Sequence, residues 1–411
     1  MKNNETIVNG SLFSLFSFVN RGFSFLLLLI LANYIAPAEY GYLSLFGTVV
    51  MVVGYFIALS MEGYLSVSFF RDGQNGITQT FSCVLFTSLI IATFFYLLLF
   101  FFGDDIAIKL DLPQHCLFFA VGISFLTVYS HLILNYFRLQ KKIRIYGFFS
   151  CGNACLNFIL SILLVKTFLF GWEGRVYAQL SCCCIFGLIG LFFFIKKRFV
   201  SLPNKKHWKM MLLWGIPLIP HLATTFIRQG CDRYIVNYYH TIEDVGLFSF
   251  ALNLANIIIM VGIGFNQSNS VDIYSILGNQ NMTTEEKKKL IKARRMNIFL
   301  IYLVCSAFIT FGCFIAIPFV LPKYSMAMKY FPILALYAFI NCLYFLYTNF
   351  LFYYKKTKKL MYITFGASLS HLMLSLCLTQ YSLYYTCMVY LISQVLIVLL
   401  VRRNVNKLFE A

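Results

Sequence analysis

The chain has 411 residues, of which 60% are hydrophobic and 12% are charged, and its formal net charge is +18. A soluble domain carries about 25% charged residues, so this composition excludes an ordinary water-soluble protein. The basic excess of a hydrophobic chain more often reflects Lys and Arg in cytoplasmic loops than nucleic-acid binding, and we expect no nucleic-acid partner.

Twelve apolar runs are long enough to cross a bilayer, which takes about 20 mostly apolar residues. In chain order they are residues 12–34, 41–63, 81–102, 116–137, 148–169, 176–195, 210–239, 246–270, 297–321, 330–352, 360–380 and 383–401. The first run is too long for a cleaved signal peptide, so we expect it to be a retained helix. The seventh is overlong and contains Pro217 and Pro220, so we expect it to be tilted or broken.

The basic residues predict the orientation of these helices. With the N-terminus placed in the cytoplasm, 25 Lys and Arg residues fall in cytoplasmic segments and six fall on the opposite side. Such a bias is typical of multi-pass proteins of the inner membrane, and it predicts that both termini are cytoplasmic. No loop on the outer side exceeds about 15 residues, which leaves no room for an outer catalytic domain.

The largest hydrophilic segment, residues 276–296, is cytoplasmic in this topology. Thr283 and Glu286 have the spacing of a capping box and predict the start of a helix. The Lys/Arg-rich run that follows fits a helix near anionic lipid head groups, and it fits a solvated charged face equally well.

The two halves of the chain resemble each other. Three pairs share an offset of 205 residues (Glu39 and Asp244, Gly41 and Gly246, Ser44 and Ser249), and two pairs share an offset of 214 (Asn135 and Asn349, Lys141 and Lys355). We therefore predict an all-α membrane protein of two pseudo-symmetric six-helix bundles, residues 1–200 and 201–411. In transporters built from parallel repeats the substrate site lies between the halves.

Signatures of soluble enzymes are absent, including the phosphate loop, H-E-x-x-H and G-x-S-x-G. The 13 cysteines lie mostly inside apolar runs and have no metal-site spacing, so we interpret them as small apolar packing residues. We therefore expect no catalytic residues, no metal and no cofactor.

Polar groups inside the spans are the candidate functional residues, because ionisable side chains there are costly and usually face a cavity or a partner. Arg21, beside Asn20, lies inside the first span, and Arg228 and Arg233 lie in the seventh. These four residues are candidates for binding an anionic substrate, since arginine can bind two phosphate oxygens at once. For Arg21 and Arg233 the alternative is snorkelling to nearby head groups.

Two carboxylates are candidates for ion coupling. Asp232 is four residues from Arg228, so the two could pair on one helix face. Glu62 lies at the predicted cytoplasmic end of the second span, where it could face a vestibule or simply cap a helix.

The stretch from Val19 to Tyr34, followed by Ala38 to Phe46, resembles the N-terminus of polysaccharide-export flippases of the Wzx type. The length, the number of spans and the basic loop after the fourth span resemble that family too. The superfamily also includes multidrug-and-toxin extruders and lipid II flippases.

The resemblance implies transport of an undecaprenyl-pyrophosphate-linked oligosaccharide from the cytoplasmic to the periplasmic leaflet by alternating access. It implies a cationic central cavity in which Arg21 and Arg228 contact the pyrophosphate or acidic sugars. Its other expected partners are membrane lipids and polysaccharide assembly proteins. Two alternatives stay open, namely a small-molecule exporter of the same fold and an O-antigen polymerase.

Overall fold

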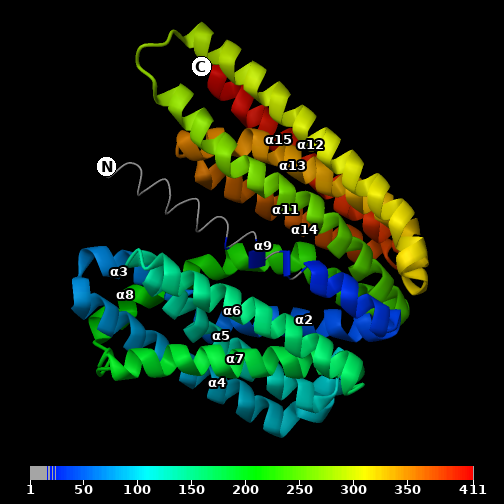
Figure 1. Cartoon of the computed structure of the whole chain (residues 1–411). Helices are drawn as coiled ribbons and strands as arrows, with labels where there is room; N and C mark the ends of the chain where they lie inside the picture. The colour runs from blue at the N-terminus through cyan, green and yellow to red at the C-terminus, as the bar shows by residue number, and fades with distance from the viewer. Residues whose placement is uncertain (1–15, 17–18, 21, 24, 411) are drawn as a thin grey trace. The chain divides into compact units, whose positions relative to one another are not determined.

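The computed structural model describes residues 16, 19–20, 22–23 and 25–410, and these residues are almost entirely helical (Figure 1). Among the described residues, eleven helical stretches are long and apolar enough to cross a membrane when the interrupted run Lys205–Tyr239 is counted as one, and residues Phe25–Tyr34 form a shorter apolar helix. Residues 12–15, 17–18, 21 and 24 of the first predicted span lie outside the described residues. The prediction of an all-helical multi-pass membrane protein is confirmed.

The chain forms two compact units, Met1–Phe226 and Ile227–Ala411. The first contains α2 (Pro37–Ile57), η1 (Met61–Tyr64), α3 (Leu65–Arg71), α4 (Gly73–Leu110), α5 (Gln114–Leu139), α6 (Ile143–Ile162), η2 (Leu163–Thr167), α7 (Gly171–Lys196), α8 (Lys205–Gly215) and η3 (Ile216–Leu218). The second contains α10 (Cys231–Tyr239), α11 (Ile242–Gly278), α12 (Thr284–Val320), η4 (Pro322–Lys329), α13 (Phe331–Tyr353), α14 (Thr357–Leu378) and α15 (Leu383–Glu410). The helix α9 (Ile219–Gln229) contains the boundary.

The first unit extends to Phe226 because the chain after α7 packs back onto it. Nε1 of Trp208, on α8, donates a hydrogen bond to Oγ1 of Thr87 at 2.9 Å. The backbone N–H of Ser201 donates to Oγ of Ser82 at 2.9 Å. These contacts bind the start of α8 and the segment before it to α4.

The seventh predicted span is broken, as its prolines predict. A 3₁₀ turn at Ile216–Leu218 separates α8 from α9, and α9 and α10 are separated at Gly230. Proline lacks the N–H that a helix interior needs, and its ring clashes with the preceding turn. The break turns one apolar run into three short helices.

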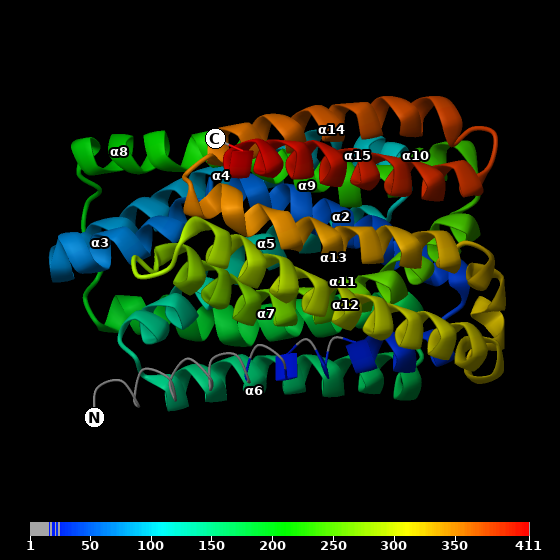
Figure 2. The ribbon, with the colours of Figure 1, turned by 90° about the horizontal axis from the view of Figure 1, so that it is seen from above.

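The two units repeat the same helix pairings. In the first unit α5 packs against α2 and α7, and α7 packs against α6. In the second unit α13 packs against α11 and α15, and α15 packs against α14, as Figure 2 lets the reader follow. The fourth spans of the two halves, α5 and α13, therefore have corresponding neighbours.

The repeat also extends to the start of equivalent helices. Oε2 of Glu39 accepts a hydrogen bond from the backbone N–H of Ala36 at 2.8 Å at the start of α2. Oδ2 of Asp244 accepts one from the backbone N–H of Thr241 at 3.3 Å at the start of α11. Both acids satisfy an N–H that the helix itself leaves unpaired. The predicted capping box of Thr283 and Glu286 is likewise present at the start of α12.

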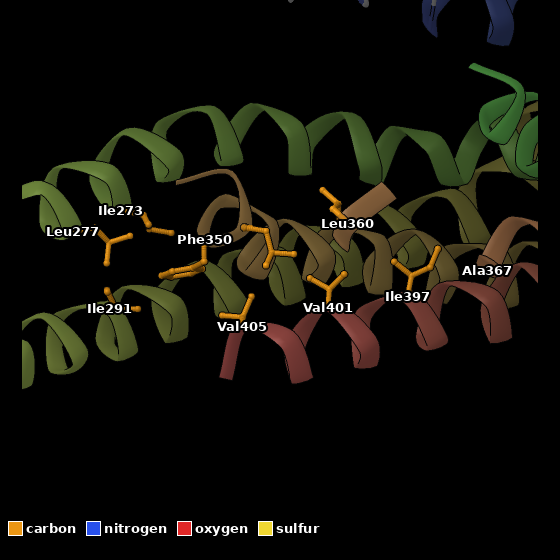
Figure 3. Close-up of a cluster of buried hydrophobic side chains, with 10 residues drawn as sticks. Ile273, Leu277, Ile291, Phe350, Leu360, Ala367, Ile397, Val401 and Val405 are labelled. Atoms are coloured by element: carbon orange, nitrogen blue, oxygen red, sulfur yellow. The ribbon is translucent and has the colours of Figure 1, made fainter. Parts of the chain in front are cut away.

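An apolar cluster joins five helices of the second unit (Figure 3). Leu277 of α11 and Ile291 of α12 contribute to it, together with Phe350 of α13 and Val405 of α15. Helices α11 and α12 have 37 residues each, or roughly 55 Å at 1.5 Å per residue, which exceeds the ~30 Å hydrocarbon core of a bilayer. The cluster packs the C-terminal end of α11 and the start of α12 against α13 and α15.

Candidate functional site

A polar cavity of about 650 Å³ lies within the first unit. Its polar lining comes from three regions: the segment around Asn20, the 3₁₀ turn η1, and helices α5 and α6. The polar lining residues are Asn20, Ser60, Glu62, His131, Asn135, Arg138, Tyr146 and Ser150. Sequence reasoning named two of them, Asn20 and Glu62, and the structure brings these two to the same cavity.

The turn η1 is held against α8 by close packing. A Cβ on Gly63 would lie 2.8 Å from Cη2 of Trp214, so only glycine lets the indole ring approach this closely. Tyr64 packs edge-to-face on the same indole, with ring centroids 5.7 Å apart. This packing positions Glu62, the neighbour of Gly63, at the cavity wall.

Glu62 is the carboxyl group of this cavity. Its Oε2 atom is buried and has no hydrogen-bond partner among the described residues. Burial raises the pKa of the Glu62 carboxyl above its ordinary value, because a charged carboxylate loses hydration there. The group can therefore take up and release a proton nearer to neutral pH than an exposed glutamate.

The rest of the lining offers a cation and hydrogen-bonding groups. Arg138 is exposed, and its Nη2 donates to Oδ1 of Asn135. Nδ2 of Asn20 donates to Oγ of Ser150 at 2.5 Å. A guanidinium group with nearby amides and hydroxyls can bind phosphate oxygens and sugar hydroxyls. Arg21, which the sequence places beside Asn20, lies outside the described residues.

A buried polar network lies within the second unit and is centred on Asp232 of α10. The Asp232 side chain is 0% exposed and that of His371, on α14, is 1% exposed. Nε2 of His371 lies 2.8 Å from Oδ2 of Asp232, and Oγ of Ser375 donates to Oδ1. Nδ1 of His371 lies 3.0 Å from Oγ of Ser393 on α15.

The hydroxyl of Ser393 has two possible acceptors. Its Oγ lies 3.0 Å from Nδ1 of His371 and 3.1 Å from the carbonyl oxygen of Tyr390. If Ser393 donates to Tyr390, Nδ1 of His371 is the donor to Ser393, and if Ser393 donates to Nδ1, Nδ1 is the acceptor.

The two arginines of the seventh predicted span have partners within the second unit. Nη2 of Arg228 donates to Oε1 of Gln394 on α15. Arg233 donates from Nε to Oγ of Ser249 at 3.3 Å and from Nη1 to the carbonyl oxygen of Gln229 at 2.8 Å. The pairing of Arg228 with Asp232 considered from their spacing is not among the ion pairs of the described residues, where the partner of Asp232 is His371.

Sequence reasoning missed three residues that complete these sites, His131, Arg138 and His371. Arg138 was counted among the basic residues of a cytoplasmic loop, but it lines the cavity. His371 is a lone histidine in an apolar run, and the internal repeat was the available signal. It lies 214 residues after Asn157, and Ser375 lies 214 residues after Ser161.

Residues 7–271 match the model of the family described as polysaccharide biosynthesis protein, and residues 217–377 match the MatE family model. The first match covers more than half of the chain. The chain belongs to the polysaccharide biosynthesis protein family. The family resemblance drawn from the sequence is thereby confirmed.

Two proteins of Haemophilus influenzae resemble this member of the polysaccharide biosynthesis protein family. The Lsg locus putative protein 1 is 22% identical over 272 residues, which span 64% of this chain and 65% of that protein. An uncharacterized membrane protein is 22% identical over 360 residues, or 85% of this chain and 84% of that protein.

Two solved structures share its fold. A multidrug resistance MATE family transporter of the MOP superfamily, in an inward-facing conformation, gives a TM-score of 0.74 at 14% identity, over 93% of this chain and 95% of the transporter. The lipid II flippase MurJ, in an inward closed conformation, gives 0.73 at 15% identity, over 96% and 87%. At such identities the likeness concerns the fold alone.

Proposed function

We propose that this protein is a flippase that moves an undecaprenyl-pyrophosphate-linked oligosaccharide repeat unit from the cytoplasmic to the periplasmic leaflet of the bacterial inner membrane by alternating access. The observation that carries the proposal is the family match over residues 7–271. The repeat unit would belong to an O-antigen or a capsule, and proteins of polysaccharide assembly would supply and consume it.

The cavity of the first unit supports an anionic and hydroxyl-rich cargo. Its one cationic side chain among the described lining residues is Arg138, and its other polar groups are mostly amides and hydroxyls. In the predicted topology it opens near the cytoplasmic side, where such a cargo would be collected. Asn20, with Arg21 beside it, would contact the pyrophosphate or the first sugar there, and Arg228 and Arg233 are the candidate contacts in the second unit.

The network of the second unit supports a proton as the coupling ion. The partners of the Asp232 carboxylate are an imidazole nitrogen and a hydroxyl donor. A hard metal cation would need a shell of oxygen ligands instead. Glu62, whose pKa is raised and whose Oε2 has no hydrogen-bond partner among the described residues, is the second candidate for carrying a proton.

A small-molecule exporter is the alternative that the MatE match favours, since residues 217–377 fit that family model as well. The two functions differ in cargo. Cationic drugs need acidic groups in the binding cavity, whereas the described lining of the first unit holds one carboxyl group and one guanidinium.

Deletion of the gene in its native host tests the proposal, with undecaprenyl-linked oligosaccharide assayed on each face of the inner membrane. We expect complete repeat units to accumulate on the cytoplasmic face, and Arg138→Gln to restore less surface polysaccharide than Lys141→Gln, an exposed control. Single repeat units that reach the periplasm but never lengthen would indicate a polymerase. Normal surface polysaccharide with increased drug sensitivity would indicate the exporter.

A further inference from the structure

Arg175 is a cation of the first unit that neither site above uses. It lies in the second turn of α7, and its Nη1 donates to Oδ1 of Asn157 at 2.5 Å and to Oγ of Ser161 at 3.1 Å. Both acceptors are neutral groups of α6. No ion pair joins Arg175 to a carboxylate among the residues that the structure describes.

A pocket of about 200 Å³ adjoins this arginine. Arg175, Asn157 and Tyr40 form its polar side, and leucines and phenylalanines such as Leu27, Leu31 and Phe158 form the rest. This volume is below the ~300–1,000 Å³ of sites for drug-sized ligands. A phosphate group and the first carbons of a lipid chain match both the size and the division into a cationic and an apolar side.

The second unit contains a polar pair equivalent to Asn157 and Ser161, and that pair binds a charged group that has a partner of opposite character. His371 and Ser375 correspond to Asn157 and Ser161 at the offset of 214 residues. There the pair binds the Asp232 carboxylate, and the basic partner, His371, is itself a member of the pair. In the first unit the pair binds a guanidinium, and both of its members are neutral.

A guanidinium among apolar side chains is costly unless an anion accompanies it. Among the described residues, only Nη1 of Arg175 donates hydrogen bonds to protein acceptors, so Nη2 and Nε can donate to a ligand. Two donors of one guanidinium match two oxygens of a phosphate. The hydrogen bonds to Asn157 and Ser161 fix the orientation of the Arg175 guanidinium before a ligand binds.

We propose that this pocket binds the phosphate of a lipid, with Arg175 as its anchor and the apolar wall against the start of the lipid chain. In the predicted topology α7 begins at the outer side of the membrane. The pocket would then receive the carrier phosphate on the release side, a role that rests on the proposed flippase function. Binding of the phosphate does not depend on that role.

A purely structural role for Arg175 makes a different prediction for one substitution. Asn157→Asp replaces the neutral acceptor with a carboxylate at the same position and gives Arg175 a counter-ion inside the protein. A structural tie between α6 and α7 would be strengthened and lipid binding would not change. In a binding site, the new carboxylate competes with the phosphate and repels it.

The test is native mass spectrometry of the full-length protein in detergent, with undecaprenyl phosphate, phosphatidylglycerol or uncharged undecaprenol added. The variants are Arg175→Gln, Asn157→Asp and Lys109→Gln, the last an exposed control at the same end of the first unit. We expect Arg175→Gln and Asn157→Asp to bind the phosphate-bearing lipids about ten- to a hundredfold more weakly. That fold-change corresponds to the loss of one charge-assisted hydrogen bond. Undecaprenol retention and the Lys109→Gln variant should be unchanged.

If Arg175→Gln fails to fold, the lipid binding of Asn157→Asp decides the question. We expect the thermal midpoint of Asn157→Asp to be at or above that of the parent chain. Loss of both phosphorylated lipids assigns the site to lipid phosphate in general, and loss of undecaprenyl phosphate alone assigns it to the carrier. Unchanged retention of both lipids by Asn157→Asp overturns the proposal, whatever the export assay gives. Conversely, if the export assay contradicts the proposed flippase function, a measured loss of lipid binding would still support the phosphate site.

Discussion

Oδ2 of Asp232 lies 2.8 Å from Nε2 of His371, although the two residues are 139 positions apart and their side chains are 0% and 1% exposed. Burying two ionisable groups costs hydration free energy, which their attraction often only offsets. A pair of apolar residues at these positions would stabilise the fold equally well. The presence of this pair therefore favours a role in function, which we propose to be proton coupling.

Breaking the pair from one side should cost stability. His371→Ala leaves the Asp232 carboxylate buried without its basic partner, and we expect a loss of about 3–5 kcal/mol in the free energy of unfolding. Asp232→Asn keeps a hydrogen-bonding group but removes the charge, so it should retain most of the stability and lose export. Thermal unfolding in detergent and complementation of the deletion strain measure the two effects.

The matched control is His115→Ala, which removes the exposed ion pair of His115 and Glu173, 3.2 Å apart. An exposed pair contributes about 0–1 kcal/mol, so this variant should unfold almost as the parent chain does. Equal destabilisation by both histidine variants would contradict the argument from burial.

Glu62 should make stability depend on pH. Burial raises its pKa in the folded protein, so its contribution to stability is fully present below the unfolded pKa of about 4.3 and is lost as pH rises through the folded pKa. Glu62→Gln removes that loss. Its thermal midpoint relative to the parent chain should therefore rise as the pH increases above the unfolded pKa.

Asp72 provides a control of opposite sign. The hydrogen bond from Arg71 lowers the pKa of the Asp72 carboxyl, so its contribution is present above the unfolded pKa and is lost as pH falls through the folded pKa. Asp72→Asn should differ from the parent chain only near neutral pH, and the difference should fade under acid. Parallel pH curves for Glu62→Gln and the parent chain would count against the burial of Glu62.

Gly190 allows α7 to approach α5. A Cβ at this position would lie 2.5 Å from the carbonyl oxygen of Tyr129, a backbone atom that cannot turn aside. We expect Gly190→Ala to cost about 1–3 kcal/mol of stability, as overpacking does. Gly264→Ala, in α11 with nothing within 4 Å, should instead gain up to about 1 kcal/mol, because alanine favours a helix. Thermal unfolding of both variants checks the contrast.

Cys377 tests the predicted orientation. It is the one exposed cysteine of the 13, and it lies at the C-terminal end of α14, on the predicted outer side. A membrane-impermeant maleimide should label it in spheroplasts, and Cys377→Ser should lose that label. A cysteine introduced in the cytoplasmic segment by Lys289→Cys should react only after permeabilisation. The reverse pattern would invert the topology.

Much of the fold follows from local properties of the chain. Apolar length marks the membrane helices, the prolines mark the break after Gly215, and the spacing of Thr283 and Glu286 marks the start of α12. Each of these depends on residues within a turn or a bilayer thickness of one another. For the same reason the family could be recognised from a short N-terminal stretch together with the pattern of spans.

The sites depend on contacts between residues far apart in the chain. The sequence by itself determined that Asp232, Glu62 and the arginines are costly polar groups in an apolar protein. Tertiary structure decided their partners: Asp232 meets His371, Arg228 meets Gln394, and Arg175, which the sequence places in an outer loop, meets Asn157. Helix periodicity says which residues share a face, but only the packing of one helix on another says which faces meet.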